Sequence, residues 1–403
     1  MKLKPIREQV VVIIGASSGI GRVCALRFAK KGAALVVAAR GEEGLSTLVE
    51  EIVAAGGEAV YQVCDATLPE DVAAVAKYAE ARYGRIDTWV NDAAVSVYAK
   101  FWDTTPEEYL RVMEVNYLGQ IHGCLSALPA LRRTGAGAII AISPVESMVS
   151  LPLHAAYSAS KHAVEGAMDA LRRELMADGV PISVTSVKPA TINTPFFNNS
   201  RKKMDVKPKG PSPIYDPQVV ADCVLYAAEH PVRDLFAGGA ARMMARAQAT
   251  MPGMVDLMLA RAGIPASRTD VPRPGGKQGN LYEPCAGDRM NGDFTPKARR
   301  FSAYTWLETH PKVRLLAMGG VVLAGAMLAQ RRGERPAETV EPVAEPALLL
   351  LSDETEVLVL ETEIETEIET VIVLTERADD VSLDEPAEAW MAPIHPRQTP
   401  VDA

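Results

Sequence analysis

A tyrosine and a lysine four residues apart could together carry proton transfer. Tyr157 and Lys161 lie in the string Tyr-Ser-Ala-Ser-Lys, and apolar residues of helical period follow it. Residues four apart lie on one face of a helix, so both side chains can enter the same cleft. A free phenol has a pKa near 10 and is a poor base at neutral pH. Because a nearby ammonium group favours the phenolate, the pair predicts a tyrosine that exchanges a proton with a substrate oxygen.

A glycine-rich turn near the start of the chain could hold a phosphate group. Gly15, Gly19 and Gly21 follow the apolar run Val10–Ile14 directly and precede a helix expected at Arg22–Lys30. Glycines are needed where a strand turns sharply into a helix and the backbone approaches a pyrophosphate. The first N–H groups of the helix and its dipole then attract the anion. The order of strand, turn and helix therefore predicts a dinucleotide-binding site.

Alternating strands and helices must position these two motifs. Up to about residue 235, apolar β-branched runs alternate with amphipathic stretches long enough for helices, which is typical of repeated βαβ units. We therefore expect an α/β fold with a doubly wound parallel sheet, the Rossmann arrangement. Residues 199–217 are expected to form a loop over the open face. The expected strands are Val10–Ile14, Ala34–Ala38, Ala59–Cys64, Asp87–Asn91, Ala138–Ile142 and Ile182–Lys188.

Composition excludes several classes of protein. The chain has 403 residues, and its 48% apolar content is ample for a sizeable core. Five scattered cysteines without a Cys-x-x-Cys pair exclude a disulfide scaffold or zinc knuckle and fit a reducing compartment. The formal net charge of −9 arises from an acidic C-terminal part on a mildly basic body, a balance that requires no nucleic-acid partner. We expect a cytoplasmic catalytic domain.

The chain divides by composition into four parts: a dinucleotide-binding domain at 1–240, a helical or irregular extension at 241–312, a short hydrophobic helix at 313–332 and an acidic low-complexity tail at 333–403. The uncharged run Leu315–Ala329 would rise about 22 Å as a helix, short of the roughly 30 Å hydrocarbon core. Flanking Arg and Lys side chains can extend its reach, so 313–332 is a candidate membrane anchor. A helix buried on the body is the alternative. The acidic tail is expected to be disordered.

The glycine spacing and the Tyr-x-x-x-Lys string together resemble the short-chain dehydrogenase/reductase family. The spacing Gly-x-x-x-Gly-x-Gly differs from the Gly-x-Gly-x-x-Gly of most dinucleotide folds. The resemblance covers roughly residues 8–235. It implies a nicotinamide cofactor and reversible hydride transfer between that cofactor and a carbonyl or alcohol substrate, with Tyr157 as general acid/base. It also implies a homodimer or tetramer through the helices around Asn116 and Lys161.

The same resemblance implies roles for further residues. Lys161 would hold the nicotinamide ribose, and Asn116 would position a water molecule in the proton relay. Asn116 could instead be an ordinary helix residue bonded to backbone. Thr194 and the backbone of Ile192 would hold the nicotinamide carboxamide. The residues expected to bind the cofactor are Gly15, Ser17, Ser18, Gly19, Ile20, Gly21, Arg40, Asp65, Asn91, Ala93, Tyr157, Lys161, Pro189, Ile192 and Thr194.

Position 40 bears on the choice between NADP and NAD. An acidic residue near the end of the second strand would hold the ribose hydroxyl of NAD, but this sequence has Ala39-Arg40 there. A carboxylate would repel the 2′-phosphate of NADP, whereas a guanidinium can bind it with two hydrogen bonds. The sequence therefore favours NADP(H) over NAD(H), with a solvated loop cation as the alternative interpretation of Arg40.

Pro144 is the departure from the family that bears most on activity. The family's substrate-polarising serine lies thirteen positions before the tyrosine, and this chain has a proline there. Ser143 and Ser147 are the nearest hydroxyls. Losing one oxyanion donor typically costs about 3–4 kcal/mol, so the alternative to an active enzyme is a cofactor-binding scaffold or sensor. An epimerase or dehydratase with the same Tyr/Lys pair is a second alternative, which the narrow glycine spacing disfavours.

Several histidines and methionines are not assigned to the site. His122, His154 and His162 are not spaced with carboxylates or thiols as a metal site requires, and we expect no metal. His154 lies near the expected pocket and is expected to be a polar surface residue. The methionines could line a substrate entrance, but a Met-rich helix packed on the body is favoured; they are Met243, Met244, Met251, Met254 and Met258. The sequence does not indicate which substrate is used.

Overall fold

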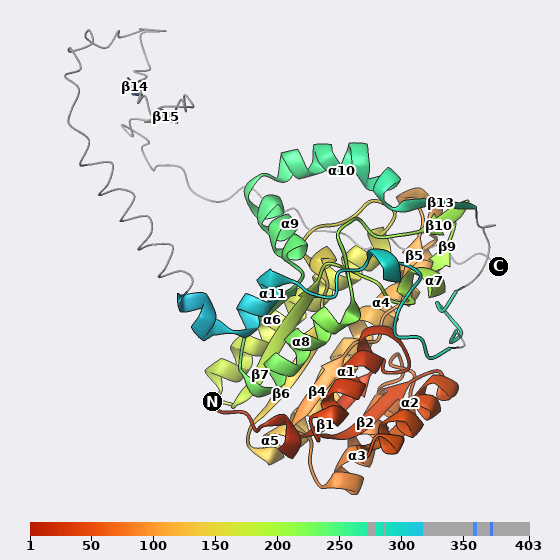
Figure 1. The fold of residues 1–403 in the computed structure, drawn as a ribbon, viewed down its shortest axis with the longest axis vertical. Coiled ribbons are helices and arrows are strands. Elements are labelled where there is room, and N and C mark those ends of the chain that lie inside the picture. The colour runs from red at the N-terminus through yellow and green to blue at the C-terminus, as the bar shows by residue number, and fades with distance from the viewer. Residues whose placement is uncertain (273–278, 286, 317–357, 361–370, 374–403) are drawn as a thin grey trace, which may run out of the picture. The chain divides into compact units, whose positions relative to one another are not determined.

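A seven-stranded sheet forms the centre of the N-terminal part of the chain in this computed structural model (Figure 1). All its pairings are parallel, and the strand order is β12-β7-β6-β4-β1-β2-β3. The order reverses between β1 and β4, so a crevice opens outside their carboxyl ends. The predicted doubly wound sheet is confirmed. The strands are β1 (Val10–Ile14), β2 (Ala34–Ala39), β3 (Glu58–Val63), β4 (Thr88–Asn91), β6 (Gly137–Ile142), β7 (Ile182–Pro189) and β12 (Asp234–Ala237).

Continuous apolar strands fit this sheet because helices cover both of its faces. Every residue of β1, β6 and β7 is buried. The predicted boundaries of the six strands agree with the observed ones to within one residue. The edge strand β12 was not predicted, because four residues are too few to establish an alternating or continuous apolar pattern.

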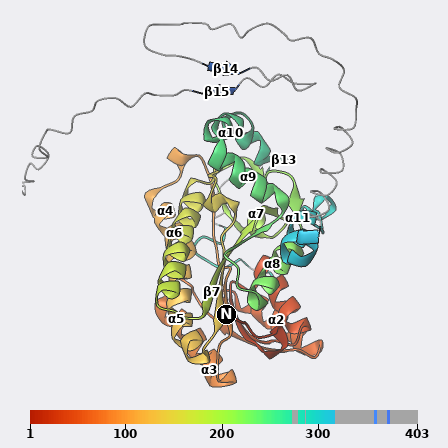
Figure 2. The same ribbon diagram turned by 90° about the vertical axis from the view of Figure 1, so that its left-hand side faces the viewer.

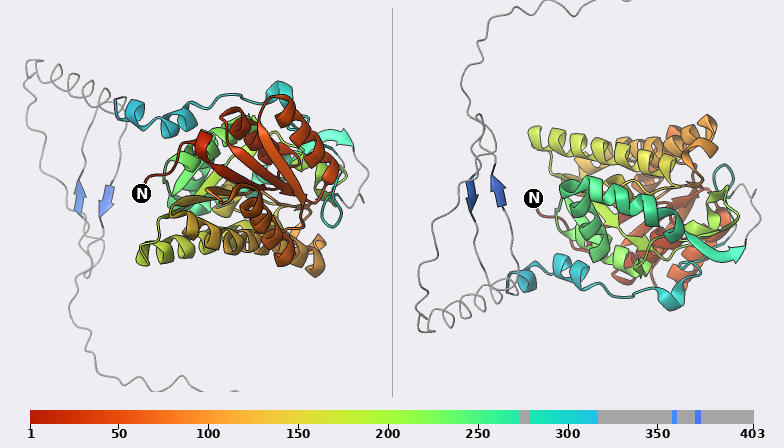
Figure 3. Two further views of the ribbon diagram at one scale, coloured as in Figure 1. Left: turned by 90° about the horizontal axis from the view of Figure 1, so that it is seen from below. Right: turned by 90° about the horizontal axis from the view of Figure 1, so that it is seen from above.

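Two helical layers enclose the sheet (Figures 2 and 3). The helices α1, α2 and α8 share one apolar core with one face of the sheet, and α3, α5 and α6 share a second core with the other face. The first helix begins at Gly19, three residues earlier than predicted. The layer helices are α1 (Gly19–Lys30), α2 (Glu42–Ala54), α3 (Pro69–Tyr83), α5 (Gly119–Thr134), α6 (Ala155–Ala177) and α8 (Pro217–Glu229).

The remaining helices are shorter or lie near the carboxyl ends of the strands. In Figures 1 and 2, α9 and α10 lie together at one end of the molecule. These helices are α4 (Pro106–Met113), α7 (Phe196–Asn199), α9 (Gly239–Thr250), α10 (Pro252–Ala266) and α11 (Ala303–Thr309). Short helical turns occupy Ile6–Glu8, Phe101–Asp103, Glu114–Leu118, Val145–Ser147 and Thr295–Lys297, the third of them a π-helical turn.

Short strand pairs build much of the region expected to be a loop. Residues 199–217 include three strands that pair with other parts of the chain, which corrects the prediction of a plain loop. Each of the three strands within 199–217 contains only two or three residues, which is too few to produce a periodic pattern in the sequence. The pairs are β5 (Val97–Tyr98) with β9 (Arg201–Lys202), β8 (Thr191–Ile192) with β11 (Ile214–Tyr215), and β10 (Val206–Pro208) with β13 (Arg268–Pro272).

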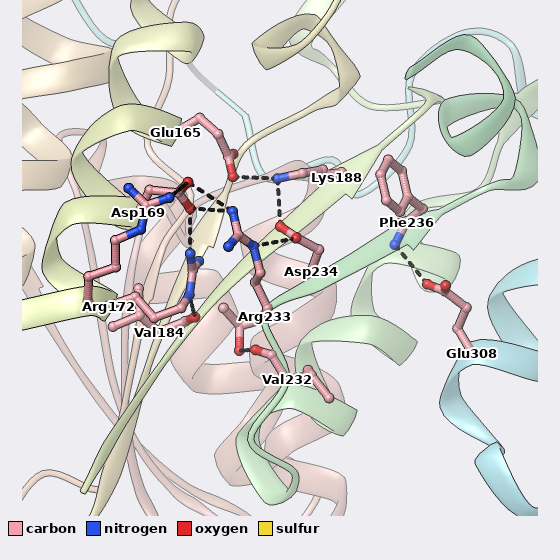
Figure 4. Close-up of polar contacts among 12 residues, drawn as sticks. Glu165, Asp169, Arg172, Val184, Lys188, Val232, Arg233, Asp234, Phe236 and Glu308 are labelled. Atoms are coloured by element: carbon pink, nitrogen blue, oxygen red, sulfur yellow. Dashed lines mark hydrogen bonds and ion pairs between the residues drawn. The ribbon is translucent and has the colours of Figure 1, made fainter. Parts of the chain in front are cut away.

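A network of ion pairs fixes α6 against the edge of the sheet (Figure 4). Lys188 on β7 is buried, and its Nζ lies 2.6 Å from Glu165 Oε1 on α6 and 2.9 Å from Asp234 Oδ1 on β12. Arg233 joins Asp169 of α6 at 2.8 Å and Asp234 at 3.0 Å. Because α6 carries Tyr157 and Lys161, this network holds the helix of the candidate site in place.

The short helix α11 covers the outer side of β12. Glu308 Oε2 accepts a hydrogen bond from the Phe236 amide at 3.2 Å (Figure 4). The Thr305 hydroxyl donates to the Phe236 carbonyl at 3.1 Å. The backbone of an edge strand otherwise presents unpaired polar groups. The extension beyond residue 240 therefore completes the sheet at this edge.

The structure describes only part of the chain, namely residues 1–272, 279–285, 287–316, 358–360 and 371–373. Contacts divide the chain into two compact units, Met1–Gly325 and Ala326–Ala403. In the second unit, β14 (Leu358–Leu360) pairs antiparallel with β15 (Val371–Val373). Most of the predicted hydrophobic helix 313–332 and of the acidic tail 333–403 lies outside the described residues. Within the described part, no helix is both long and apolar enough to cross a membrane.

Candidate active site

A cavity of about 520 Å³ opens at the carboxyl ends of the parallel strands. This volume falls within the range of small-molecule and cofactor sites, roughly 300–1,000 Å³. Most residues predicted to bind a cofactor line it: Gly15, Ser17, Ser18, Gly19, Ile20, Arg40, Asp65, Ala93, Tyr157, Lys161, Pro189, Ile192 and Thr194. Gly21, Asn91 and Asn116 do not appear in the lining. The fold thus brings motifs separated by up to 179 positions into one cavity.

The glycine turn has the close packing that a dinucleotide cradle requires. Gly15 has a φ of +96°, and a Cβ built there would lie 2.5 Å from the Ala93 amide nitrogen. A Cβ on Gly21 would lie 2.4 Å from the carbonyl oxygen of Gly15. Only glycine fits these positions without displacing backbone. The turn therefore brings the start of α1 to the cavity, where the Gly19 amide donates to the Arg289 carbonyl at 3.0 Å, and the close backbone packing fits the pyrophosphate of a dinucleotide.

Asp92 is a carboxylate on the cavity wall that contacts this turn. Its Oδ2 accepts a hydrogen bond from the Gly21 amide at 2.8 Å. Burial raises the pKa of Asp92 to about 7, although the nearby Lys161 ammonium and the Gly21 hydrogen bond oppose the shift. The side chain therefore titrates near neutrality. Asp92 was not among the residues predicted to bind the cofactor, although its neighbours Asn91 and Ala93 were.

Tyr157 and Lys161 both face the cavity from α6, as predicted from their spacing. The Lys161 Nζ donates a hydrogen bond to the Ile142 carbonyl at 2.9 Å and lies 5.8 Å from the centre of the Tyr157 ring. Burial lowers the pKa of Lys161 from 10.5 to about 8, opposed by the Asp92 and Glu146 carboxylates. A buried ammonium is destabilised because it loses its hydration.

The pKa of Tyr157 corrects the expectation that the lysine makes this phenol acidic. Burial raises the pKa of Tyr157 well above its ordinary value, and the carboxylates of Glu146 and Asp92 raise it further. Each of these effects disfavours the phenolate. The chain by itself therefore holds Tyr157 as a neutral phenol, which is the form that donates a proton.

Two predicted asparagines are engaged in the protein interior. Asn116 Oδ1 accepts from the Val95 amide at 2.8 Å, while its Nδ2 donates to the Val95 carbonyl at 2.9 Å and to Ser160 Oγ at 3.0 Å. Asn91 Oδ1 accepts from the Trp89 indole at 2.9 Å. Both side chains are buried. Asn116 thus joins the segment after β4 to the α6 helix, consistent with the backbone-bonded alternative.

Neither serine near Pro144 supplies a hydroxyl to the cavity. Pro144 lines the cavity, whereas Ser143 and Ser147 do not. Both serines are buried, and their hydroxyl oxygens lack a hydrogen-bond partner among the described residues. Ser143 directly follows the strand β6, where successive side chains alternate between faces, and Ser147 lies in the helical turn Val145–Ser147.

His154 is buried, which corrects the expectation of a surface histidine. Only 4% of its surface is exposed, and it lines the cavity together with Glu146. The His154 Nδ1 lies 2.8 Å from Glu146 Oε2, which also accepts from the Ser158 hydroxyl at 3.1 Å. No spacing rule indicated this pair, because its geometry depends on how the turn after β6 folds against the start of α6.

Aromatic and aliphatic side chains form the wall of the cavity around Tyr157. Its ring centre lies 5.2 Å from that of Phe196 and 5.5 Å from that of His154. Tyr98 packs against His154 in a tilted arrangement, with ring centres 3.9 Å apart and an angle of 58° between the ring planes. The substrate end of the cavity is therefore largely apolar. Further lining residues there are Val95, Val145, Val149, Leu151, Phe197 and Met244.

The five methionines of the extension divide between the cavity and the surface. Met244 lines the cavity, whereas Met243 is 70% exposed. The other three are also exposed: Met251, Met254 and Met258. The interpretation as cavity-lining residues therefore holds for Met244 alone, and the favoured packing of these methionines on the body is wrong for the four exposed ones.

Residues 280–285 and 287, which the sequence did not assign to the site, contribute to the lining of the cavity near Arg40. Arg40 donates to the Asn280 carbonyl at 2.6 Å and to the Tyr282 carbonyl at 2.8 Å. Leu281 is fully buried, and its carbonyl accepts from Arg111 Nε at 3.1 Å. Arg40 therefore lines the cavity as predicted and also binds this segment. Lining residues from it are Asn280, Pro284, Cys285 and Gly287.

Comparisons with known proteins agree with this geometry. Residues 9–205 match the family model described as short chain dehydrogenase. The uncharacterised oxidoreductase YxnA of Bacillus subtilis (strain 168) is 34% identical over 324 residues, which cover 80% of this chain and 91% of the relative. The chain therefore belongs to the short-chain dehydrogenase family. It is an oxidoreductase of that family.

Two further comparisons are less extensive. The dehydrogenase/reductase SDR family member 7B of Bos taurus is 37% identical over 201 residues, covering 48% of this chain and 61% of the relative. A short-chain dehydrogenase/reductase from Burkholderia phymatum, solved in complex with NAD, has a TM-score of 0.57 and 24% identity. It covers 63% of this chain and 96% of that chain, and the likeness shows the fold.

Proposed function

We propose that this protein is an NADP-dependent reductase of carbonyl compounds, with Tyr157 as the proton donor. The observation that carries the proposal is the placement of Tyr157 and Lys161 in one cavity with the glycine turn. When bound, the nicotinamide supplies the hydride that reduces the carbonyl carbon. The buried neutral phenol suits the reducing direction, because the substrate oxygen must then receive a proton.

Residues of the chain bind and orient the cofactor. The Gly15 turn and the start of α1 bind the pyrophosphate, which requires the Gly19 amide to exchange its bond to the Arg289 carbonyl for one to the phosphate. Lys161 binds the nicotinamide ribose, and Ile192 with Thr194 holds the carboxamide. Asn116 is a positioning residue, because it connects the segment at Val95 to the helix α6 at Ser160. The buried cavity wall excludes water, which strengthens each polar contact made there.

The preference for NADP rests on Arg40. Arg40 lines the cavity just after β2, where NAD-specific folds place a carboxylate, and its guanidinium also donates to the Asn280 and Tyr282 carbonyls. A charged donor at this place stabilises a 2′-phosphate. Arg40→Ala should weaken NADPH binding much more than NADH binding. The ratio of the two dissociation constants isolates the phosphate from the other contacts of Arg40, and an unchanged ratio would contradict the preference.

The wall around Tyr157 supports an apolar substrate. Phe196, Tyr98 and Met244 offer no charge to a substrate, and Glu146 would repel an anionic one. We therefore propose ketones or aldehydes with bulky apolar substituents. A panel that pairs apolar carbonyl compounds with carboxylated analogues tests this, since the analogues should react at least tenfold more slowly.

Loss of turnover in Tyr157→Phe is the test of the enzyme proposal. The variant should lower kcat by about 10²–10⁴, the usual value of one acid/base group, while NADPH still binds. Tyr226→Phe, on α8 far from the cavity lining, is the matched control and should behave as wild type. Full activity of Tyr157→Phe would exclude the proposed role.

A second candidate function is a cofactor-binding scaffold or sensor without turnover. Pro144 supports it, because the residue at this cavity position has no hydroxyl. A protein that binds NADPH but consumes none with the whole carbonyl panel would favour this function. Consumption of NADPH that stops in Tyr157→Phe would reject it.

We also propose a homodimer through α5 and α6. Leu118 and Leu125, beside and within α5, are 40% and 62% exposed. Large apolar side chains gain stability when a partner covers them. Sedimentation of wild type should give a dimer, and Leu125→Asp should shift it to monomer.

A further inference from the structure

The cavity around Tyr157 lacks the hydroxyl that would polarise a substrate oxygen, but it contains a buried histidine with a free nitrogen. Pro144 lines the cavity, while Ser143 and Ser147 do not. His154 lines it, is almost fully buried, and has an Nε2 atom without a hydrogen-bond partner among the described residues. Such an unpaired buried group is rare in proteins and calls for an explanation.

The other ring nitrogen of His154 is held by a carboxylate. Glu146 Oε2 lies 2.8 Å from His154 Nδ1, so Nδ1 carries a proton and donates it to Glu146. The same carboxylate oxygen accepts from Ser158 on α6 at 3.1 Å, which fixes its position. A carboxylate that orients a histidine ring in this way leaves Nε2 directed to a second partner.

Packing fixes the histidine beside the proton donor. Its ring packs at a tilt against Tyr98, with ring centres 3.9 Å apart, and its centre lies 5.5 Å from that of the Tyr157 ring. The preceding Leu153 has a φ of +71°, which non-glycine residues rarely adopt, and its carbonyl accepts from the Ala99 amide at 3.1 Å. Strained backbone of this kind persists where the surrounding structure determines it, and it is common at functional sites.

We propose that His154, oriented by Glu146, replaces the missing serine and contacts the substrate oxygen opposite Tyr157. The inference rests on the proposed reductase function. During reduction the carbonyl π electrons move to oxygen, the carbon gains the hydride, and Tyr157 gives its proton to the oxygen. The proposal requires His154 to donate from both ring nitrogens: Nδ1–H to Glu146 throughout, and Nε2–H to the substrate oxygen, where it stabilises the developing charge.

Tyr98 is the competing donor. Its hydroxyl is buried and also lacks a partner among the described residues. No carboxylate orients it, whereas His154 is held at its second nitrogen. Tyr98→Phe should therefore retain most of the activity, and a loss in this variant greater than in His154→Ala would assign the role to Tyr98 instead.

The test compares His154→Ala with variants that return a donor. His154→Ala should lower kcat for an apolar ketone by about 10²–10³, the value of one oxyanion donor, with NADPH affinity and melting temperature near wild type. His154→Gln, which keeps an N–H, should recover part of this loss. Glu146→Gln should lower kcat roughly tenfold, as is usual when an orienting partner is changed. His162→Ala, an exposed histidine on the same helix, is the matched control.

A serine introduced at position 144 tests whether His154 has a catalytic or only a structural role. The double variant Pro144→Ser with His154→Ala should be at least tenfold more active than His154→Ala alone, because the wall position at 144 then donates to the oxygen. A purely structural role for His154 predicts no such rescue. If His154→Ala fails to fold, His154→Gln with and without Pro144→Ser decides the same question.

The possible outcomes show separately whether the role of His154 and the proposed reductase function are correct. If His154→Ala keeps kcat within threefold of wild type while Tyr157→Phe is inactive, the role of His154 is wrong and the reductase function stands. If the wild-type protein shows no turnover, or Tyr157→Phe is fully active, the proposed function fails and the inference fails with it.

Discussion

The amide of Gly19 donates a hydrogen bond to the carbonyl of Arg289 at 3.0 Å. Gly19 is the first residue of α1, so this N–H belongs to the helix end expected to face the cofactor's pyrophosphate. The segment that carries Arg289 also binds Arg40 through Asn280 and Tyr282. A distant part of the chain therefore contacts both the phosphate turn and the position that would select NADP.

This contact predicts that loosening the segment speeds cofactor exchange. Leu281 anchors the segment, with its side chain fully buried against the residues around Val95 and Val112. Leu281→Ala should accelerate both association and release of NADPH by about tenfold, since removing a buried leucine costs about 2–5 kcal/mol of local packing. Stopped-flow fluorescence measures both rates. Leu257→Ala, an exposed leucine on α10, is the control, and equal rates in the two variants would contradict the prediction.

Cofactor affinity should fall as pH rises through neutrality. Asp92 on the cavity wall has a pKa raised to about 7, so it is mostly neutral at pH 6 and ionised at pH 8. The ionised form repels the anionic cofactor, so NADPH should bind about tenfold more weakly at pH 8 than at pH 6. Asp92→Asn should bind tightly at both values.

Fluorescence titration at pH 6, 7 and 8 checks the role of Asp92. Lys161 faces Asp92, and its own pKa is about 8, so its loss of charge also weakens binding above that pH. The difference between wild type and Asp92→Asn isolates the carboxylate. Parallel pH dependence in the two proteins would show that another group is responsible.

The two directions of the reaction should differ in their pH dependence. Burial keeps Tyr157 protonated at neutral pH, so carbonyl reduction has its proton donor ready and should not speed up between pH 6 and 8. Alcohol oxidation requires the phenolate, so its rate should rise with pH across the same range. Initial rates at saturating substrate measure both directions. A reduction rate that climbs with pH would contradict a raised phenol pKa.

Lys161 should lower stability at neutral pH. The fall in the pKa of Lys161 from 10.5 to about 8 corresponds to about 3 kcal/mol of lost stability for the charged form. Lys161→Met should therefore raise the free energy of unfolding at pH 7 by about 1–3 kcal/mol. The lost hydrogen bond to Ile142 reduces this gain by about 1 kcal/mol. The variant should also be inactive.

The pH dependence of unfolding tests whether the charged Lys161 lowers the stability of the protein. Between about pH 8 and 10.5 the folded lysine is neutral while the unfolded one is still protonated, so wild-type stability rises with pH and the advantage of Lys161→Met shrinks. Urea unfolding at pH 7 and pH 10 measures it, with exposed Lys77→Met as the control. If Lys161→Met is less stable than wild type at pH 7, the charged Lys161 does not lower the stability as predicted.

Local pattern in the sequence determined the parts of this protein that depend on short stretches of chain. The parallel strands follow from continuous apolar runs, the phosphate turn from glycines between a strand and a helix, and the paired orientation of Tyr157 and Lys161 from the helical repeat. Each is a property of a few neighbouring residues. The structure therefore reproduces them with small shifts in boundary.

Tertiary structure alone decided how distant groups meet. The contact of Arg40 with Asn280 spans 240 positions, and the burial of His154 against Glu146 depends on a turn folding over the start of α6. The raised pKa of Tyr157 likewise depends on carboxylates and on burial that no spacing encodes. Desolvation and hydrogen bonding depend on which surfaces pack together, and periodicity shows only that a surface is apolar, not what covers it.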